Sequence, residues 1–433
     1  MYLLEIDEQE LEQSQNQQRE PFVNEWLTVT TTSGAKLVDT VAMQICAHET
    51  HKQLRERERK KVDHEKYMGQ LRMVVANLAR STLHLEGQAL GITRNKNVLC
   101  QTRRYKASVM SKTLPKVLDM LEALGLLGQT LGDSYRVDSR HRKQTTIWPT
   151  AKFIKLMVEH RFGVSDIGQR FNGETIILKS NKDRGGNSKW IDYADTPTTH
   201  AMRSTMSLIN KHLATANIDL VADDILDYVD TSRRNLVRIF NEGQFDLGGR
   251  MYWAFWMELK KSQRASGLRI NGNRIVSLDF GQMAPRVFYS KVGADIHFED
   301  AYALPGWDPC WRPAIKTVLS AMVCSRSELT RRPKGLGKVW PNKKVAFKTL
   351  VDALKSHHAP INQFFGTGAG LTYQFKESEL VIQIILELNR KGVTALPVHD
   401  CLIVEQQHEE VARQVMRDTT MKAFGFDPVI SRE

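Results

Sequence analysis

The chain has 433 residues, a length typical of roughly two to four domains rather than one. Its 61 lysines and arginines exceed its 49 acidic residues, and the net charge of +12 favours a polyanionic partner, of which nucleic acid is the commonest. No segment approaches the roughly 20 apolar residues that span a bilayer, and five widely spaced cysteines without a CxxC pair exclude a readable disulfide framework or zinc module.

The N-terminal segment, residues 1–66, is polar and highly charged. Residues 1–48 include the Gln-rich stretch EQSQNQQRE, and we expect them to be poorly ordered or loosely docked. Residues 49–66 form a dense run of mixed charge, which predicts a solvated helix with ion pairs four residues apart. The acidic start lacks the basic region of a signal peptide, so we expect a cytoplasmic protein.

Residues 67–160 are predicted to form one small domain. Leucines recur at helical spacing from Leu114 to Leu124, and two strands, at 135–137 and 145–148, are expected around a basic tip. A helix followed by two strands in this way resembles a winged helix, which commonly binds duplex DNA but in other proteins only docks a protein partner. The basic residues that precede the helix and favour the DNA contact are Arg103, Arg104 and Lys106.

Residues 161–195 are interpreted as a linker with strands, including the flexible sequence DRGGNSK. Thr196 and Pro197 then open a helix that extends to about Ala216, because proline is favoured at the first helical position. From there to the end, the chain mixes helices and strands, which predicts an α+β fold.

Two apolar strands carry the carboxylates on which the chemistry depends. The segment IVSLDF at 275–280 carries Asp279 near its end, and the segment ALPVHD at 395–400 places Asp400 in a second strand that continues to residue 404. A buried carboxylate is costly without a partner, and Mg²⁺, which prefers oxygen ligands, is a partner that two carboxylates can share. Two such ions about 3.5–4 Å apart can activate a primer hydroxyl and hold a leaving pyrophosphate. For either motif alone, an unrelated aspartate capping a turn is the simpler interpretation.

Three motifs in this region follow one another in the order A, B, C of a known polymerase family. The segment DFGQMAPR at 279–286 resembles motif A of family A DNA polymerases, and VHD at 398–400 resembles motif C. Between them, Arg312 and Lys316 are similar to the R-x-x-x-K that begins motif B. The segment GGRMY at 248–252 resembles one in single-subunit phage RNA polymerases, which share the palm. The resemblance implies a right-hand polymerase whose palm and fingers occupy residues 196–433.

The resemblance also implies roles for matching residues. Asp279, Asp400 and the Phe280 carbonyl would bind two Mg²⁺ ions, for which Mn²⁺ can substitute. The triphosphate would be held by a charged clamp that stabilises developing negative charge, and His399 would face the primer terminus. The nucleotide-binding residues would be Arg312, Lys316, Gln282 and Ala284. The residues expected to contact nucleic acid are Arg238, Arg250, Arg286, Arg331, Arg332, Lys343 and Lys344.

A basic stretch at 331–348 contains no acidic residue and is interrupted by glycines and a proline. It includes Arg331, Arg332, Lys343 and Lys344. It predicts a mobile loop near the fingers that tracks a phosphate backbone, with a solvated, idle insertion as the alternative.

The chain also departs from the family pattern. Ala284 stands where family A DNA polymerases carry the Glu that excludes the ribose 2′-hydroxyl, which predicts tolerance of ribonucleotides. Residues 320–324, SAMVC, replace the aromatic end of motif B, and Cys401 replaces the Glu after motif C. An acidic exonuclease cluster is not evident upstream, so we expect no proofreading domain.

The leading hypothesis is therefore a compact DNA polymerase that acts on a DNA primer-template with dNTPs, and with NTPs to some extent. It would suit replication or repair in a mobile element or phage, is compatible with a replication partner protein, and requires no membrane. The alternatives are a catalytically silent DNA-binding replication initiator with a degenerate palm, and an unrelated winged-helix regulator. The altered motif B favours the initiator, whereas the retained aspartate pair favours the polymerase, because idle carboxylates in apolar strands are destabilising.

Overall fold

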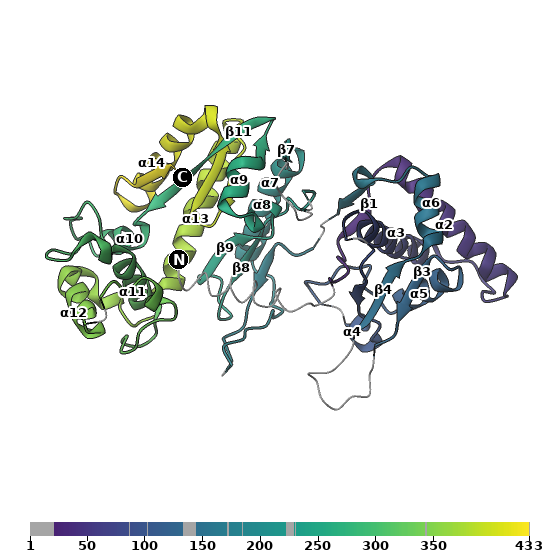
Figure 1. Ribbon diagram of the computed structural model, residues 1–433, viewed down its shortest axis with the longest axis horizontal. Coiled ribbons are helices and arrows are strands. Elements are labelled where there is room, and N and C mark those ends of the chain that lie inside the picture. Colours follow the sequence, from purple (N-terminus) through teal and green to yellow (C-terminus); the bar gives the residue numbers. More distant parts are fainter. Residues whose placement is uncertain are drawn as a thin grey trace. The chain divides into compact units, whose positions relative to one another are not determined.

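The structure is a computed structural model with described residues in two compact units (Figure 1). It describes residues 21–432, apart from 86, 102, 133–143, 171–172, 184, 222–228, 230 and 343. The smaller unit comprises residues 17–174 and 226–232, and the larger comprises 175–225 and 233–433. Both mix helices and strands, as the predicted α+β class requires. Within the described part of the chain, no helix is long and apolar enough to cross a bilayer.

The smaller unit contains a three-stranded antiparallel sheet in the order β2-β4-β3 and a separate β1-β5 pair. Helix α5 and strand β4 confirm the predicted helix at 114–124 and strand at 145–148, whereas the predicted strand at 135–137 and its basic tip lie outside the described residues. The elements are β1 (Leu27–Val29), α2 (Thr32–His51), α3 (Lys61–His84), β2 (Leu90–Ile92), α4 (Lys96–Cys100), α5 (Leu114–Ala123), β3 (Leu127–Thr130), β4 (Thr145–Pro149), α6 (Ala151–Glu159), the 3-10 helix η2 (Val164–Asp166) and β5 (Ile167–Gln169).

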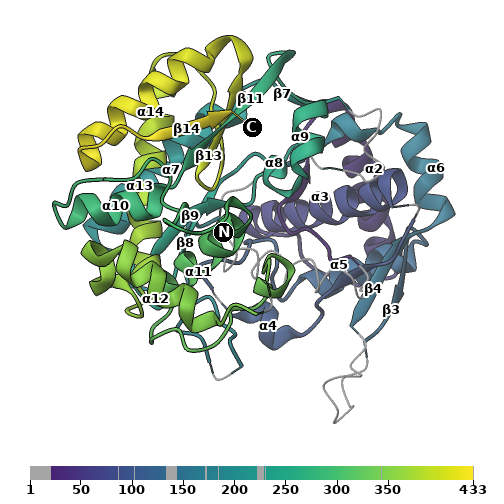
Figure 2. The same ribbon diagram turned by 60° about the vertical axis from the view of Figure 1, so that its left-hand side comes forward.

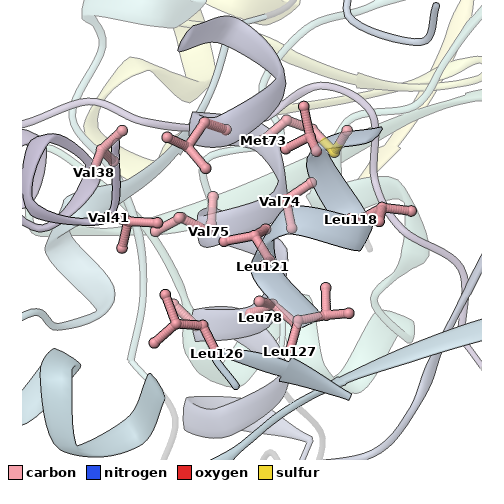
Figure 3. Close-up of a cluster of buried hydrophobic side chains, with 14 of the residues drawn as sticks. Val38, Val41, Met73, Val74, Val75, Leu78, Leu118, Leu121, Leu126 and Leu127 are labelled. Carbon is pink, nitrogen blue, oxygen red and sulfur yellow. The ribbon is translucent and has the colours of Figure 1, made fainter. Parts of the chain in front are cut away.

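Helix α3 lies at the centre of the smaller unit's core. Figure 3 shows Val74, Val75 and Leu78 of this helix among side chains of α2 and α5. Each fully buried side chain of this size stabilises the fold by about 1.5–3 kcal/mol relative to an exposed one.

The expectation of a loosely docked segment over residues 1–48 is wrong for its described part, residues 21–48. Helix α2 buries Leu37, Val38, Val41 and Ile45 against the core, and β1 pairs with β5. The spacing of these apolar residues, three to four apart, marks one face of a helix, although the polar composition of the segment hides it.

The expectation of one helix over residues 49–66 is also wrong. Helix α2 ends at His51, and α3 begins only at Lys61. The connection folds back on Glu49, which is 8% exposed and pairs with Arg55 at 3.1 Å and with Arg59 at 2.8 Å. This buried carboxylate takes its counter-charges from the connecting segment, which a continuous solvated helix would have carried away from it.

The larger unit is built around a six-stranded sheet, which follows the path β12-β13-β11-β10-β7 with β14 added beside β11. Figure 2 labels β7, β11, β13 and β14 of this sheet. Alternate residues of the central strand β11, namely Val276, Leu278 and Phe280, are buried, as the period of two in a strand requires. Asp279 therefore points to the opposite face from these three side chains.

A second, three-stranded sheet has the order β6-β8-β9, and α13 packs against β9 and also contacts α11 and α14. Helix α7 confirms the helix predicted over 196–216. The elements of the larger unit are β6 (Ile176–Leu178), α7 (Pro197–Thr215), β7 (Ile218–Leu220), β8 (Val237–Phe240), β9 (Gly248–Tyr252), α8 (Phe255–Glu258), α9 (Lys261–Gly267), β10 (Leu268–Ile270), β11 (Asn273–Gly281), α10 (Met283–Lys291), η3 (Pro309–Trp311), α11 (Arg312–Cys324), η4 (Leu336–Lys338), α12 (Phe347–His357), η5 (Ala359–Phe364), α13 (Ala369–Arg390), β12 (Leu396–Val398), β13 (Cys401–Glu405), η6 (Gln406–His408), α14 (Glu409–Phe424) and β14 (Val429–Arg432).

Candidate active site

The two aspartates predicted to bind metal lie on neighbouring parts of one sheet. In the antiparallel register of β11 and β13, Asp279 is opposite Cys401, and Asp400 directly precedes Cys401. Both carboxylates are half-buried. The juxtaposition depends on the long-range pairing of two strands, since no local effect joins these parts of the chain.

Asp400 lies in a turn rather than in the continuous strand that the sequence predicted. Val398 of β12 pairs with Cys401 of β13, so His399 and Asp400 form a two-residue hairpin loop. His399 has a φ of 58°, and the common two-residue hairpin loops require a positive φ at this first position. The chain therefore reverses direction at the site, and the tight loop defines where Asp400 stands.

Tyr302 connects the aspartates to the predicted phosphate clamp. Burial raises the pKa of Tyr302 to about 12, against the opposing effect of Arg312, and Asp300, Asp400 and Asp279 add to the rise. Because both aspartates of the predicted metal pair act on this one phenol, the three side chains share a single electrostatic environment.

Arg312 and Lys316 stand on the first turns of α11 and face the same tyrosine. The Arg312 guanidinium is 5.3 Å from the centre of the Tyr302 ring, and the Lys316 ammonium is 6.0 Å from it. Arg312 Nε also donates to Asp300 Oδ2 at 2.6 Å, yet 49% of the Arg312 side chain is exposed. The structure thus brings the two cations predicted for motif B to the region that the two aspartates influence.

Gln282 and Ala284 follow the motif A strand. Gln282 has a φ of 56° at the start of α10, and its side-chain Oε1 accepts a hydrogen bond from the Ala301 N–H at 2.7 Å. This bond ties motif A to the segment that carries Tyr302. Ala284 is half-buried and packs on an aromatic cluster that includes Phe288. The backbone of Phe280 lies opposite Ile430 of β14.

A buried network that the sequence did not reveal lies behind Asp400. Arg250 Nε donates to Glu377 Oε2 at 2.6 Å, and the Tyr373 hydroxyl donates to Glu377 Oε1 at 2.5 Å. Burial alone would lower the pKa of Arg250, but Glu377 and Asp400 raise it above its ordinary value. Burial raises the pKa of Glu377, although Arg250 opposes the effect. The only sequence signal for this network is the spacing of Tyr373 and Glu377, one helical turn apart.

Arg238 and Arg250, which were expected to contact nucleic acid, are 2% and 6% exposed. Arg238 donates to the Gly249 carbonyl at 2.9 Å and to Ser378 Oγ at 3.1 Å, and it pairs with Glu379 at 2.7 Å. A contact to a phosphate backbone needs an accessible guanidinium, whereas both of these groups are bound inside the protein. Their surroundings favour a structural role instead.

Arg286 and His399 also have internal partners. Arg286 is 8% exposed, and its Nη2 donates to the Glu299 carbonyl at 2.9 Å. The His399 ring stands edge-on to Tyr252 with 5.5 Å between ring centres. His399 is thus held at the end of strand β9, next to Asp400.

The basic stretch at 331–348 is anchored, so the expectation of a mobile loop is wrong. Its Leu336 and Trp340 are buried in a core formed with Trp311, because the stretch carries its own apolar residues between the charges. Arg331, Arg332 and Lys344 are exposed, and the Arg332 guanidinium lies 4.5 Å from the Trp340 ring centre. Lys343 lies outside the described residues.

Few of the described side chains at the site can act as metal ligands. Among the residues that the structure describes, no group of three or more His, Cys, Asp or Glu side chains is arranged to hold a metal ion. The Asp279 and Asp400 pair fits Mg²⁺ nonetheless, because this ion usually binds through one or two carboxylates and completes its shell with water and substrate phosphates.

Comparison with known proteins finds weak similarity to solved structures. No protein-family model and no curated protein matches the chain. Among solved structures, the chain is similar to the polymerase domain of Pol1 from M. smegmatis in complex with DNA primer-template and dNTP, with 12% sequence identity and a TM-score of 0.32. The match covers 94% of this chain and 66% of that one, so the chain spans just under two thirds of its length. A TM-score this low supports no inference about fold or activity.

Proposed function

We propose that this protein is a template-directed DNA polymerase whose palm and fingers are formed by residues 196–433. The observation that carries the proposal is the register of β11 and β13, which sets Asp279 beside the turn containing Asp400. Arg312 and Lys316 support it, because both face the tyrosine that the aspartates influence. A carboxylate pair beside a cationic pair suits a substrate with a metal-bound triphosphate.

In this proposal, Asp279, Asp400 and the Phe280 carbonyl hold two Mg²⁺ ions, which Mn²⁺ can replace. When bound, the ions supply Lewis-acid stabilisation of the reacting phosphate. Lys316 and Arg312 bind the triphosphate, and Arg312 exchanges the Asp300 carboxylate for a phosphate oxygen. The primer 3′-hydroxyl gives its proton to solvent, its oxygen bonds to the α-phosphorus, and the bond to pyrophosphate breaks, while His399 stands beside the primer terminus.

The remaining contacts of the substrate follow from position and charge. Gln282 and Ala284, at the start of α10, lie beneath the incoming nucleotide, and the single methyl group of Ala284 leaves space for a ribose hydroxyl. The exposed Arg331, Arg332 and Lys344 follow the phosphate backbone of the primer-template. In this proposal the protein uses dNTPs and admits NTPs.

The smaller unit is proposed to be a winged-helix-like DNA-binding domain. The order α3-β2-α4-α5-β3-β4 and the sheet order β2-β4-β3 support this proposal, because a winged helix places its wing between the last two strands. The role suits replication or repair in a mobile element or phage, with a replication protein as a further partner. The exposed free cysteines Cys46, Cys100 and Cys310 fit a reducing cytoplasm.

One observation favours a second candidate, a catalytically silent DNA-binding initiator. The end of α11, residues 320–324, carries no aromatic side chain to pack on an incoming base. In that case the aspartate pair would be retained without turnover, and DNA binding alone would remain.

Primer extension tests the proposal. Purified protein should extend a labelled primer-template with dNTPs and Mg²⁺, and Asp279→Asn or Asp400→Asn should abolish extension. Asp295→Asn, which removes an exposed carboxylate from the same unit, should extend like the wild type. DNA affinity should stay near the wild-type value in all three variants, because lysine and arginine contacts dominate it. Intact DNA binding without extension by the wild type would instead favour the initiator.

A further inference from the structure

Two tryptophans in the larger unit contact each other, and one of them directly follows a residue that contacts the candidate active site. Trp190 and Trp253 have ring centres 5.6 Å apart, and 44% of Trp190 is exposed. Trp253 directly follows Tyr252, whose ring contacts His399 in the turn that carries Asp400. The backbone of β9 therefore links the residue that contacts His399 to the tryptophan pair.

The backbone holds both tryptophans in defined positions. Trp253 has a φ of 87°, a conformation that costs a bulky residue free energy and persists only where the surroundings impose it. Its carbonyl accepts from Arg233 Nε at 3.2 Å. Trp190 forms an antiparallel bridge with Lys179, which continues the line of β6.

The segment between Lys179 and Ile191 is a closed hairpin rather than the flexible sequence expected from DRGGNSK. Ile191 N–H donates to the Leu178 carbonyl at 2.9 Å, and Ser180 N–H donates to the Lys189 carbonyl at 2.8 Å. At the turn, Asp183 Oδ1 accepts from the N–H groups of Gly185 and Asn187 at 2.8 and 2.9 Å. A short polar side chain that bonds to the following backbone stabilises a turn of this kind.

The charge of this hairpin is mostly positive. Residues 179–191 contain Lys179, Lys182, Arg184 and Lys189 against the single acid Asp183. Lys182 and Lys189 are exposed and Lys179 is half-buried, while Asp183 is engaged by the turn. A hairpin with an exposed aromatic ring and exposed lysines matches the two components of a single-stranded nucleic acid, its stacking bases and its phosphates.

We propose that Trp190, packed against Trp253 on a hairpin that also exposes Lys182 and Lys189, is a stacking platform for single-stranded nucleic acid. The inference deepens the proposed function and rests on it, because the single strand would be the template that has not yet been copied. Binding at the platform needs no metal and no nucleotide, so it can be measured separately from extension.

Fluorescence anisotropy with a labelled oligothymidylate of about 16 nucleotides tests the platform. Trp190→Ala should weaken binding about tenfold, and Trp190→Phe, which keeps an aromatic ring, should recover most of the affinity. Leu208→Ala is the matched control, because it truncates a side chain that is 60% exposed on α7 of the same unit. Equal affinities for wild type and Trp190→Ala, or equal losses in Trp190→Ala and Leu208→Ala, would overturn the proposal.

Two further measurements keep the test independent of folding and of catalysis. The double variant Lys182→Gln/Lys189→Gln should lower the slope of log Kd against log salt by about 0.7 per lysine, and an unchanged slope would overturn the electrostatic part. Titration with unlabelled oligothymidylate should quench tryptophan fluorescence less in Trp190→Phe than in the wild type. Binding through Trp190 without primer extension supports the platform and contradicts the polymerase. Extension together with unchanged binding by Trp190→Ala overturns the platform alone.

Discussion

Arg250 and Glu377 form an ion pair in the interior of the larger unit, where 6% of Arg250 and 1% of Glu377 is exposed. Removing one partner of a buried pair leaves an uncompensated charge, which costs about 3–5 kcal/mol. We therefore expect Arg250→Leu to lower the free energy of unfolding by about that amount in urea denaturation.

The control for this prediction is Arg390→Leu, which breaks the exposed pair with Glu387. A surface pair contributes about 0–1 kcal/mol, so the variant should unfold close to the wild-type urea midpoint. Equal, small losses in both variants would show that the interior pair is not desolvated in solution.

Lys316→Ala should impair nucleotide use and not template binding. The substitution removes a charge-assisted contact of about 1.5–3 kcal/mol, which corresponds to a loss in kcat/KM for dNTP of roughly 10- to 150-fold. Steady-state single-nucleotide extension measures the loss, and anisotropy with duplex DNA measures the affinity. The comparison variant is Lys338→Ala, which removes an exposed lysine from the basic stretch at 331–348. A matching loss of duplex affinity in Lys316→Ala would move the residue from the nucleotide to the DNA path.

Ala284→Glu should restore discrimination against ribonucleotides. The wild-type methyl group is half-buried beside Phe288, and a glutamate at this position would add a carboxylate arm. Parallel single-nucleotide extension with dATP and ATP should show ATP incorporation by the wild type and a selective fall in the variant. Strong discrimination by the wild type that the substitution leaves unaltered would assign the gate to another residue.

Stability should fall in mild acid because of His358. Its side chain is fully buried, and burial lowers its pKa from 6.5 to about 4, while the Ala301 carbonyl at 2.9 Å opposes the change. As pH falls from 6.5 towards 4, the unfolded state binds the proton before the native state, so stability present above pH 6.5 is lost across this window. The loss is about 3 kcal/mol at most.

Urea unfolding at several pH values measures this loss. His358→Gln should show a shallower fall in stability than the wild type between pH 6.5 and 4, whereas His200→Gln, at an exposed position on α7, should follow the wild type. Parallel curves for wild type and His358→Gln would contradict the prediction.

Local patterns of the sequence were enough to predict some elements of the larger and smaller units. The leucine spacing from Leu114 identified α5, and Pro197 marked the start of α7. The apolar run before Asp279 identified β11. The lone carboxylate near the end of this strand is unusual and marked it as a candidate site. These features depend only on residues close together in the chain.

Other features depend on partners that the sequence does not reveal. From the sequence alone, Arg238 resembles an ordinary surface residue. Only the folded chain brings it into contact with Ser378 and Glu379. In the same way, the affinity of Arg55 and Arg59 for a buried Glu49 overrides the helical tendency of the charged run between α2 and α3. Ion pairs with buried groups, one across a long sequence distance and one within a short connection, thus account for these two differences from the predicted structure.

Three successive residues of α13 hold both buried arginines of the neighbouring sheet. Glu377 pairs with Arg250 of β9, while Ser378 and Glu379 engage Arg238 of β8. Sliding or rotating α13 by even a fraction of a turn would expose two charges at once, so the helix and these strands should move as a rigid body.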